Sequence, residues 1–153
     1  MMSELRRAAA GDSPPGAAAS GFMNSLFNAA KRFKGDQMIQ HGSPPFLECS
    51  SRGDRRFSAL YAEVNGRSIE VQYQSAKVFA DGSTGLPWRK AKGRRAVNAE
   101  EVAALYLRLW DQYIDENPHL LEILRQASGL SDQFGQPGRV CQATELWRIR
   151  NSR

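Results

Sequence analysis

The sequence predicts a single α+β domain that is mostly helical and has a small strand content. Three observations predict it: several segments with apolar residues at helical spacing, one aromatic and apolar segment that ends at Asn65-Gly66, and a length of 153 residues. That length suits one domain with a tail. No apolar run approaches the roughly 18 residues of a membrane span, so we expect no membrane partner.

The N-terminal region differs in composition from the rest of the chain. Residues 1–20 are rich in Ala, Gly, Ser and Pro, and we expect them to be a disordered tail because they offer little apolar surface to bury. Residues 21–40 are expected to form a short helix and a linker, which leaves 41–153 as the globular domain. The two cysteines, Cys49 and Cys141, are typical of free thiols in a reducing compartment, so we expect a cytoplasmic protein.

The first elements of the domain are predicted from turn and cap signals. Residues 57–64 are aromatic and apolar and end at the turn dipeptide Asn65-Gly66, which predicts a strand. Ser68 is a suitable N-cap for a helix over residues 68–80.

Three further helices are predicted downstream. Asn98 and Glu101 have capping-box spacing for a helix over about 99–115. Asn117-Pro118 opens the next helix, which Gly129 ends, and residues 141–150 form the last one. The predicted core stripe of the 99–115 helix consists of Val102, Leu105, Tyr106, Leu109, Trp110 and Tyr113.

The helix at 68–80 carries polar residues where a core pattern expects apolar ones. Glu70, Gln74 and Lys77 share one face at i, i+4 and i+7, with apolar residues on both flanks. A buried carboxylate is costly unless it is paired, and the lysine on the same face supplies a pair. Such pairs often lie at functional sites, which makes Glu70 and Lys77 candidates; the alternative is a surface arrangement without a role.

Three loops contain candidate binding residues. The arginines of the Ser50–Arg56 loop, Arg55 and Arg56, suit phosphate oxygens, and Trp88 with Lys92 suits a stacked base beside a phosphate. Asp132 and Phe134 belong to a glycine-rich loop that can approach a ligand closely. The alternative for each segment is an exposed loop without a role.

Several chemistries lack their sequence signals. The chain has two histidines and no His-Cys cluster at metal spacing, no Walker loop, no GxGxxG and no G-x-S-x-G elbow. If the protein is an enzyme, we therefore expect carboxylate chemistry without a metal or cofactor.

The order of these motifs resembles the NADAR family of N-glycosidases over about residues 57–151. In that family one helix carries a glutamate, an aromatic residue at +3, Gln at +4 and Lys at +7. Here these positions are Glu70, Tyr73, Gln74 and Lys77.

Downstream motifs extend the resemblance. The family has a tryptophan near a lysine, an N-P-x-L helix that ends at glycine, and an aspartate-aromatic-glycine loop before a last helix that ends in arginine. Comparable here are Trp88 with Lys90 or Lys92, Asn117-Pro118, Asp132 to Gly135, and Arg148 or Arg150. The family's acidic neighbours of the tryptophan are Pro87 and Arg89 in this chain.

The resemblance implies a NADAR-like fold and hydrolysis of the bond between ribose and a nitrogen base. The implied substrate is a phosphorylated, nucleotide-like small molecule, either a riboflavin-pathway intermediate or ADP-ribosylated guanine, with ADP-ribosylated nucleic acid as a further partner. Glu70 would stabilise an oxocarbenium-like transition state, and Lys77 would keep Glu70 ionised or contact the ribose or phosphate. The expected substrate-binding residues are Arg55, Arg56, Gln74, Trp88, Lys92, Asp132 and Phe134.

Two other functions remain open. The net charge of +5 and the basic loops also suit a nucleic-acid-binding accessory protein without catalysis. A helical interaction domain that uses residues 21–34 to bind a partner is the third hypothesis.

Overall fold

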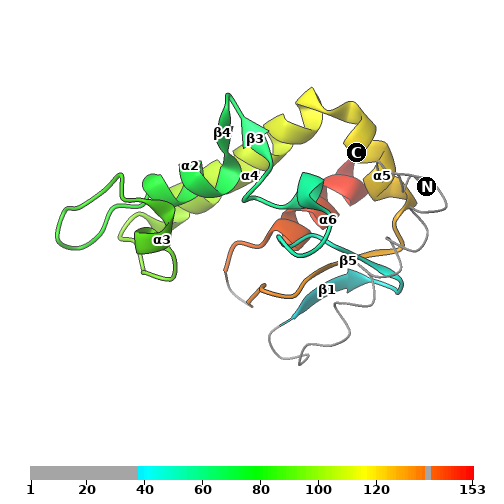
Figure 1. The fold of residues 1–153 in the computed structure, drawn as a ribbon, viewed down its shortest axis with the longest axis horizontal. Helices are drawn as coiled ribbons and strands as arrows, with labels where there is room; N and C mark the ends of the chain where they lie inside the picture. Colours follow the sequence, from blue (N-terminus) through cyan, green and yellow to red (C-terminus); the bar gives the residue numbers. More distant parts are fainter. Residues whose placement is uncertain (1–37, 137–138) are drawn as a thin grey trace.

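The computed structural model describes residues 38–136 and 139–153 (Figure 1). The predicted tail at 1–20 and the predicted helix at 21–34 lie outside the described residues. The first strand, β1 (Ile39–Gly42), begins ahead of the predicted domain start at residue 41.

A three-stranded sheet joins segments that are far apart in the sequence. Its central strand, β5 (Gly129–Asp132), pairs antiparallel with β1 and parallel with β2 (Phe46–Glu48). The prediction that Gly129 ends a helix is wrong, because Gly129 opens this strand. A Cβ added to Gly129 would lie 2.5 Å from the carbonyl oxygen of Ser43, so the close approach of two backbones requires glycine here.

Most of the predicted strand at 57–64 is not a strand. The segment begins in a short 3-10 helix, η2 (Arg55–Phe57), and only β3 (Glu63–Val64) pairs, antiparallel with β4 (Arg67–Ser68). The turn between them is confirmed, with positive φ values of 56° at Asn65 and 81° at Gly66. The apolar content of the segment reflects burial in the core rather than a strand; its buried residues include Phe57, Ala59, Ala62 and Val64.

The helix predicted at 68–80 is shorter than expected. α2 (Ile69–Ser75) begins as predicted, because the Ser68 hydroxyl accepts a hydrogen bond from the Val71 amide. It ends early because the Asn98 side chain bonds to the backbone just after Ser75. Its Nδ2 donates to the Ala76 carbonyl, and its Oδ1 accepts from the Val78 amide. Asn98 is the N-cap residue of α4 (Ala99–Glu116), as predicted, but its side chain makes no cap bond to the backbone amides of that helix.

The long helix and the two after it match their predicted positions. α4 (Ala99–Glu116) buries most of its predicted stripe, and α5 (Pro118–Gln126) starts with its proline in the first turn. α6 (Gln142–Ser152) packs on the sheet, and its Arg150 donates to the Leu124 and Ala127 carbonyls at the end of α5.

These elements form a single α+β domain, as predicted. Figure 1 shows α2 and the short α3 (Trp88–Ala91) beside the first half of α4, whereas α6 lies over β5 and β1. Within the described residues, no helix is both long and apolar enough to cross a membrane.

Candidate active site

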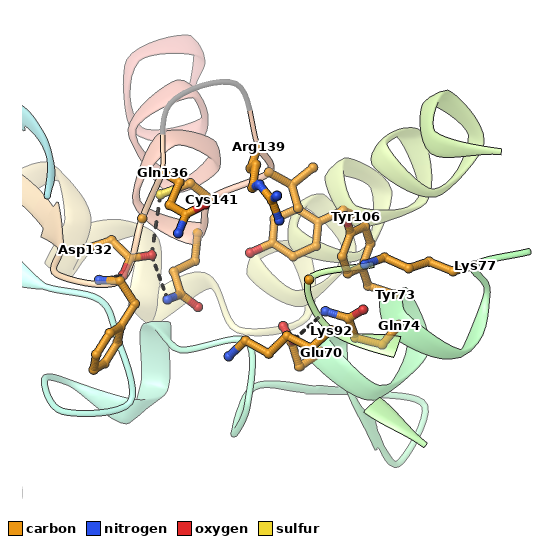
Figure 2. Close-up of a pocket in the computed structure, with 15 residues that line it drawn as sticks. Glu70, Tyr73, Gln74, Lys77, Lys92, Tyr106, Asp132, Gln136, Arg139 and Cys141 are labelled. Carbon is orange, nitrogen blue, oxygen red and sulfur yellow. Dashed lines mark hydrogen bonds between the residues drawn. The ribbon is translucent and has the colours of Figure 1, made fainter. Parts of the chain in front are cut away.

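A pocket of about 250 Å³ lies between α2 and the loop that joins β5 to α6 (Figure 2). One wall comes from α2, the opposite wall from the end of β5 and the start of α6, and Lys92 adds an edge from the segment after α3. The lining residues are Glu70, Tyr73, Gln74, Lys77, Lys92, Gly93, Tyr106, Asp132, Phe134, Gly135, Gln136, Arg139, Val140, Cys141 and Gln142.

Glu70 and Gln74 of α2 line this pocket together with Lys77, which follows two residues after the end of the helix. Gln74 is only 4% exposed and Lys77 only 6%, whereas Glu70 is half-buried. The Gln74 Nε2 donates a hydrogen bond of 2.8 Å to Oε2 of Glu70. Among the described residues, nothing donates to the other oxygen, Oε1, so this carboxylate has one oxygen available to a ligand or water.

Lys77 is not the direct partner of Glu70 that the sequence suggests. Its Nζ donates to the carbonyl oxygens of Ala91 and Arg94, at 3.4 and 3.3 Å, and lies 5.2 Å from the centre of the Tyr73 ring. Burial lowers the pKa of Lys77, and the negative charge of Glu70 opposes that shift. Lys77 therefore makes no ion pair with Glu70, and it joins the segment after α2 to the end of α3 and to Arg94.

Asp132 is held rigidly in the opposite wall. It is 4% exposed, and its Oδ1 accepts from the Phe134 amide while its Oδ2 accepts from Gln142 Nε2 and Cys141 Sγ. Burial, and then the Asp132 charge, raise the pKa of the Cys141 thiol to about 12. Cys141 is accordingly a neutral thiol near pH 7, which argues against a thiolate nucleophile in this pocket.

A second buried carboxylate fixes the strand from which Asp132 extends. Glu48 is fully buried and accepts hydrogen bonds from the Ser131 hydroxyl and from the amides of Ser50 and Gln133. Burial raises the pKa of Glu48, and the three hydrogen bonds oppose that shift. Glu48 joins the ends of β2 and β5, so its role is to position the Asp132 wall.

Two tyrosines contribute an aromatic surface between the walls. Tyr73 and Tyr106 pack edge to face, with ring centres 5.1 Å apart, and both line the pocket. Tyr106 was predicted only as part of the core stripe of its helix, because helical spacing cannot distinguish a core position from a pocket floor. It gave no role to Arg139 or Gln142, whose position depends on how the loop after β5 returns to the domain.

The structure brings together six of the predicted site residues and leaves three elsewhere. Glu70, Gln74, Lys77, Lys92, Asp132 and Phe134 line the pocket. Trp88 does not line it, because its ring packs against its own basic neighbours, with Arg89 and Lys92 at 4.9 and 5.5 Å.

The two predicted arginines near residue 55 have structural partners away from the pocket. Arg56 forms a two-pronged ion pair with Asp54, and Arg55 stacks over the Tyr61 ring at 4.6 Å. These contacts stabilise the η2 turn, and neither side chain lines the pocket.

We also looked for groups of side chains that could hold a metal ion. Within residues 38–136 and 139–153, no group of three His, Cys, Asp or Glu side chains is arranged to hold a metal ion.

The chain was compared with models of known protein families, and none matches it. A comparison with curated proteins finds no match either.

Proposed function

We propose that the protein is an N-glycosidase that hydrolyses the bond between ribose and a nitrogen base in a phosphorylated, nucleotide-like substrate. One observation carries the proposal: Glu70 lies in a pocket with one carboxylate oxygen held by Gln74 and the other without a partner among the described residues. The NADAR resemblance, which rests on the spacing of Glu70, Tyr73, Gln74 and Lys77, supports the same chemistry.

In this reaction Glu70 would stabilise positive charge that develops on the ribose. The bond from C1′ to the base nitrogen breaks, and its electron pair leaves with the base. Positive charge develops on C1′ and the ring oxygen, and a carboxylate beside them stabilises that charge. Water then adds its hydroxyl to C1′, while its second proton ends on the base nitrogen through Glu70 or solvent.

The other lining residues suit binding and orientation. The hydrogen bond from Gln74 limits the rotamers of Glu70, and the Tyr73 and Tyr106 rings offer a surface for an apolar sugar face or a base. Phe134 is 53% exposed at the mouth of the pocket, where its ring can stack on a base. Asp132, tied down by three donors, suits recognition of ribose hydroxyls rather than proton transfer.

A base-release assay tests the proposal. The protein is incubated with ADP-ribosylated guanine nucleotides, pyrimidine intermediates of riboflavin synthesis, and NAD, and chromatography detects free base. We expect release by the wild type and a loss of about 100-fold or more in Glu70→Gln. Glu63→Gln, at an exposed position on β3, is the matched control and should keep full activity. No release from any substrate would contradict the proposal, and release unaffected by Glu70→Gln would remove Glu70 from the mechanism.

A second candidate function, nucleic-acid binding, is favoured by one exposed basic segment. The segment that runs from α3 to the start of α4 carries Arg89, Lys90, Lys92, Arg94 and Arg95, all exposed. Fluorescence anisotropy with labelled single-stranded DNA and RNA, measured at rising salt, tests this function. Binding through these residues should weaken steeply with salt, and a double Lys90→Gln, Arg95→Gln variant should show a shallower slope.

A further inference from the structure

A second pocket, of about 270 Å³, adjoins the one that contains Glu70. It extends from Lys77 toward the start of α4 and is lined there by Arg94, Arg95, Ala96, Ala99, Val102 and Ala103. The two pockets share the lining residues Tyr73, Lys77, Gly93, Arg139 and Val140. These shared residues place the two pockets side by side. We refer to the second pocket as the basic compartment.

Charge is divided between the two pockets. Among the described residues, the carboxylates that line them are Glu70 and Asp132, and both belong to the first pocket. The charged side chains of the basic compartment are Lys77, Arg94, Arg95 and Arg139, and all are cationic. A ligand that spans both pockets would thus have its anionic group at the basic compartment and its reacting bond near Glu70.

The four cationic side chains differ in how many contacts each already makes within the domain. Arg94 stacks over the Phe79 ring at 4.0 Å, and Lys77 donates to two backbone carbonyls. Arg95 and Arg139 are exposed, and neither forms an ion pair with an acid of the described residues. These two arginines come from different loops, one before α4 and one before α6, and both line the same compartment. Two guanidinium groups that line one cavity suit the oxygens of a phosphate.

We propose that the basic compartment binds a phosphate group of the substrate through Arg95 and Arg139, while the ribose of that substrate lies at Glu70. The inference names the substrate class of the proposed function, a ribosyl compound with a terminal phosphate, and rests on that function for the place of the ribose. It replaces Arg55 and Arg56 as phosphate contacts, because both of those side chains lie outside either pocket.

Calorimetric titration of the full chain with ribose 5-phosphate and with ribose tests the inference, in a buffer free of phosphate and sulfate. We expect ribose 5-phosphate to bind at least about tenfold more tightly than ribose, since charge-assisted hydrogen bonds are the stronger ones. The double variant Arg95→Gln, Arg139→Gln should lose about tenfold in affinity for ribose 5-phosphate and nothing for ribose. Arg108→Gln, at an exposed position of α4 outside both pockets, is the matched control.

The outcomes separate this inference from the proposed function. If ribose 5-phosphate binds no more tightly than ribose, does not bind, or binds the double variant as well as the wild type, the phosphate site is wrong. If its binding depends on both arginines but no substrate releases a base, the phosphate site stands and the glycosidase proposal fails. Circular dichroism of each variant establishes that a lost affinity is not lost folding.

Discussion

Gln74 donates a 2.8 Å hydrogen bond to Glu70 across one turn of α2. This bond orients one carboxylate oxygen and leaves the second toward the pocket. The same amide has a buried oxygen, Oε1, without a partner in the described part of the chain. A buried oxygen without a hydrogen bond is unfavourable for stability, so this position is better explained by its effect on Glu70 than by folding.

Replacement of Gln74 by leucine separates these two effects. Gln74→Leu should lower the rate of base release by about tenfold, because Glu70 loses the bond that orients it. Its free energy of unfolding in urea should change by less than about 1 kcal/mol, since the unsatisfied oxygen is removed as well.

Gln72→Leu is the contrasting variant. It removes hydrogen bonds to the carbonyls of Val64 and Arg67, which hold the β3–β4 hairpin. It should reduce stability by about 1 kcal/mol and keep the activity. The interpretation of Gln74 fails if the Gln74→Leu variant releases base at the wild-type rate.

The Cys141 thiol should react slowly with iodoacetamide near pH 7. Its pKa is raised from 9.0 to about 12, so the thiolate is scarce at neutral pH and its fraction rises tenfold per pH unit up to that pKa. Mass spectrometry of the labelled peptide at several pH values measures the rate. Fast labelling at pH 7 would contradict the buried, neutral thiol.

The same shift makes stability depend on pH. Because the pKa is higher in the folded than in the unfolded state, the unfolded state loses its proton first as pH rises, and folding is disfavoured from about pH 9 toward pH 12. The decline in the urea midpoint above pH 9 should be smaller in Cys141→Ala than in the wild type. Cys49, whose pKa burial also raises well above 9.0, contributes in the same direction in both proteins.

Gly129→Ala should destabilise the domain by about 1 to 3 kcal/mol, because the new Cβ would overlap backbone atoms of Ser43 and His41 at the centre of the sheet. Gly82→Asn is the matched control: Gly82 has a φ of +85° but open space around it, and asparagine tolerates that conformation. Thermal unfolding of both variants measures the difference. Equal midpoints would show that the sheet adjusts without cost.

Asn98→Ala should destabilise the domain by about 1 to 3 kcal/mol, since it leaves the Val78 amide and the Ala76 carbonyl without their side-chain partner. Asn98→Asp keeps the acceptor for Val78 and loses the donor to Ala76, so its loss of stability should be smaller. Hydrogen exchange at the Val78 amide should accelerate in the alanine variant and less in the aspartate variant. Unchanged exchange in both would contradict the role given to Asn98.

Local signals account for what the sequence predicts well. The stripe of α4, the Ser68 cap, the Asn65-Gly66 turn and the proline start of α5 each depend on residues a few positions apart. Glu70 and Gln74 were placed together for the same reason, since one helical turn separates them, whereas Lys77 reaches the pocket from beyond the end of α2.

The parts that the sequence did not predict depend on distant contacts. Gly129 resembles a helix stop until the Ser43 carbonyl beside it is known, and the early end of α2 depends on the side chain of Asn98, just before α4. Arg139 carries no pattern of its own, and its relation to Arg95 follows only from the fold. The strands are three or four residues long in the sheet, too short for alternation to identify them.

The double hydrogen bond of Asn98 has a mechanical consequence for the pocket. By joining the end of α2 to the start of α4, it couples the wall with Glu70 to the helix with Tyr106. A change that displaces the start of α4 would consequently displace the Glu70 wall as well. Asn98 thus helps to set the distance between the Glu70 carboxylate and the Tyr106 ring, although α3 separates their helices in the sequence.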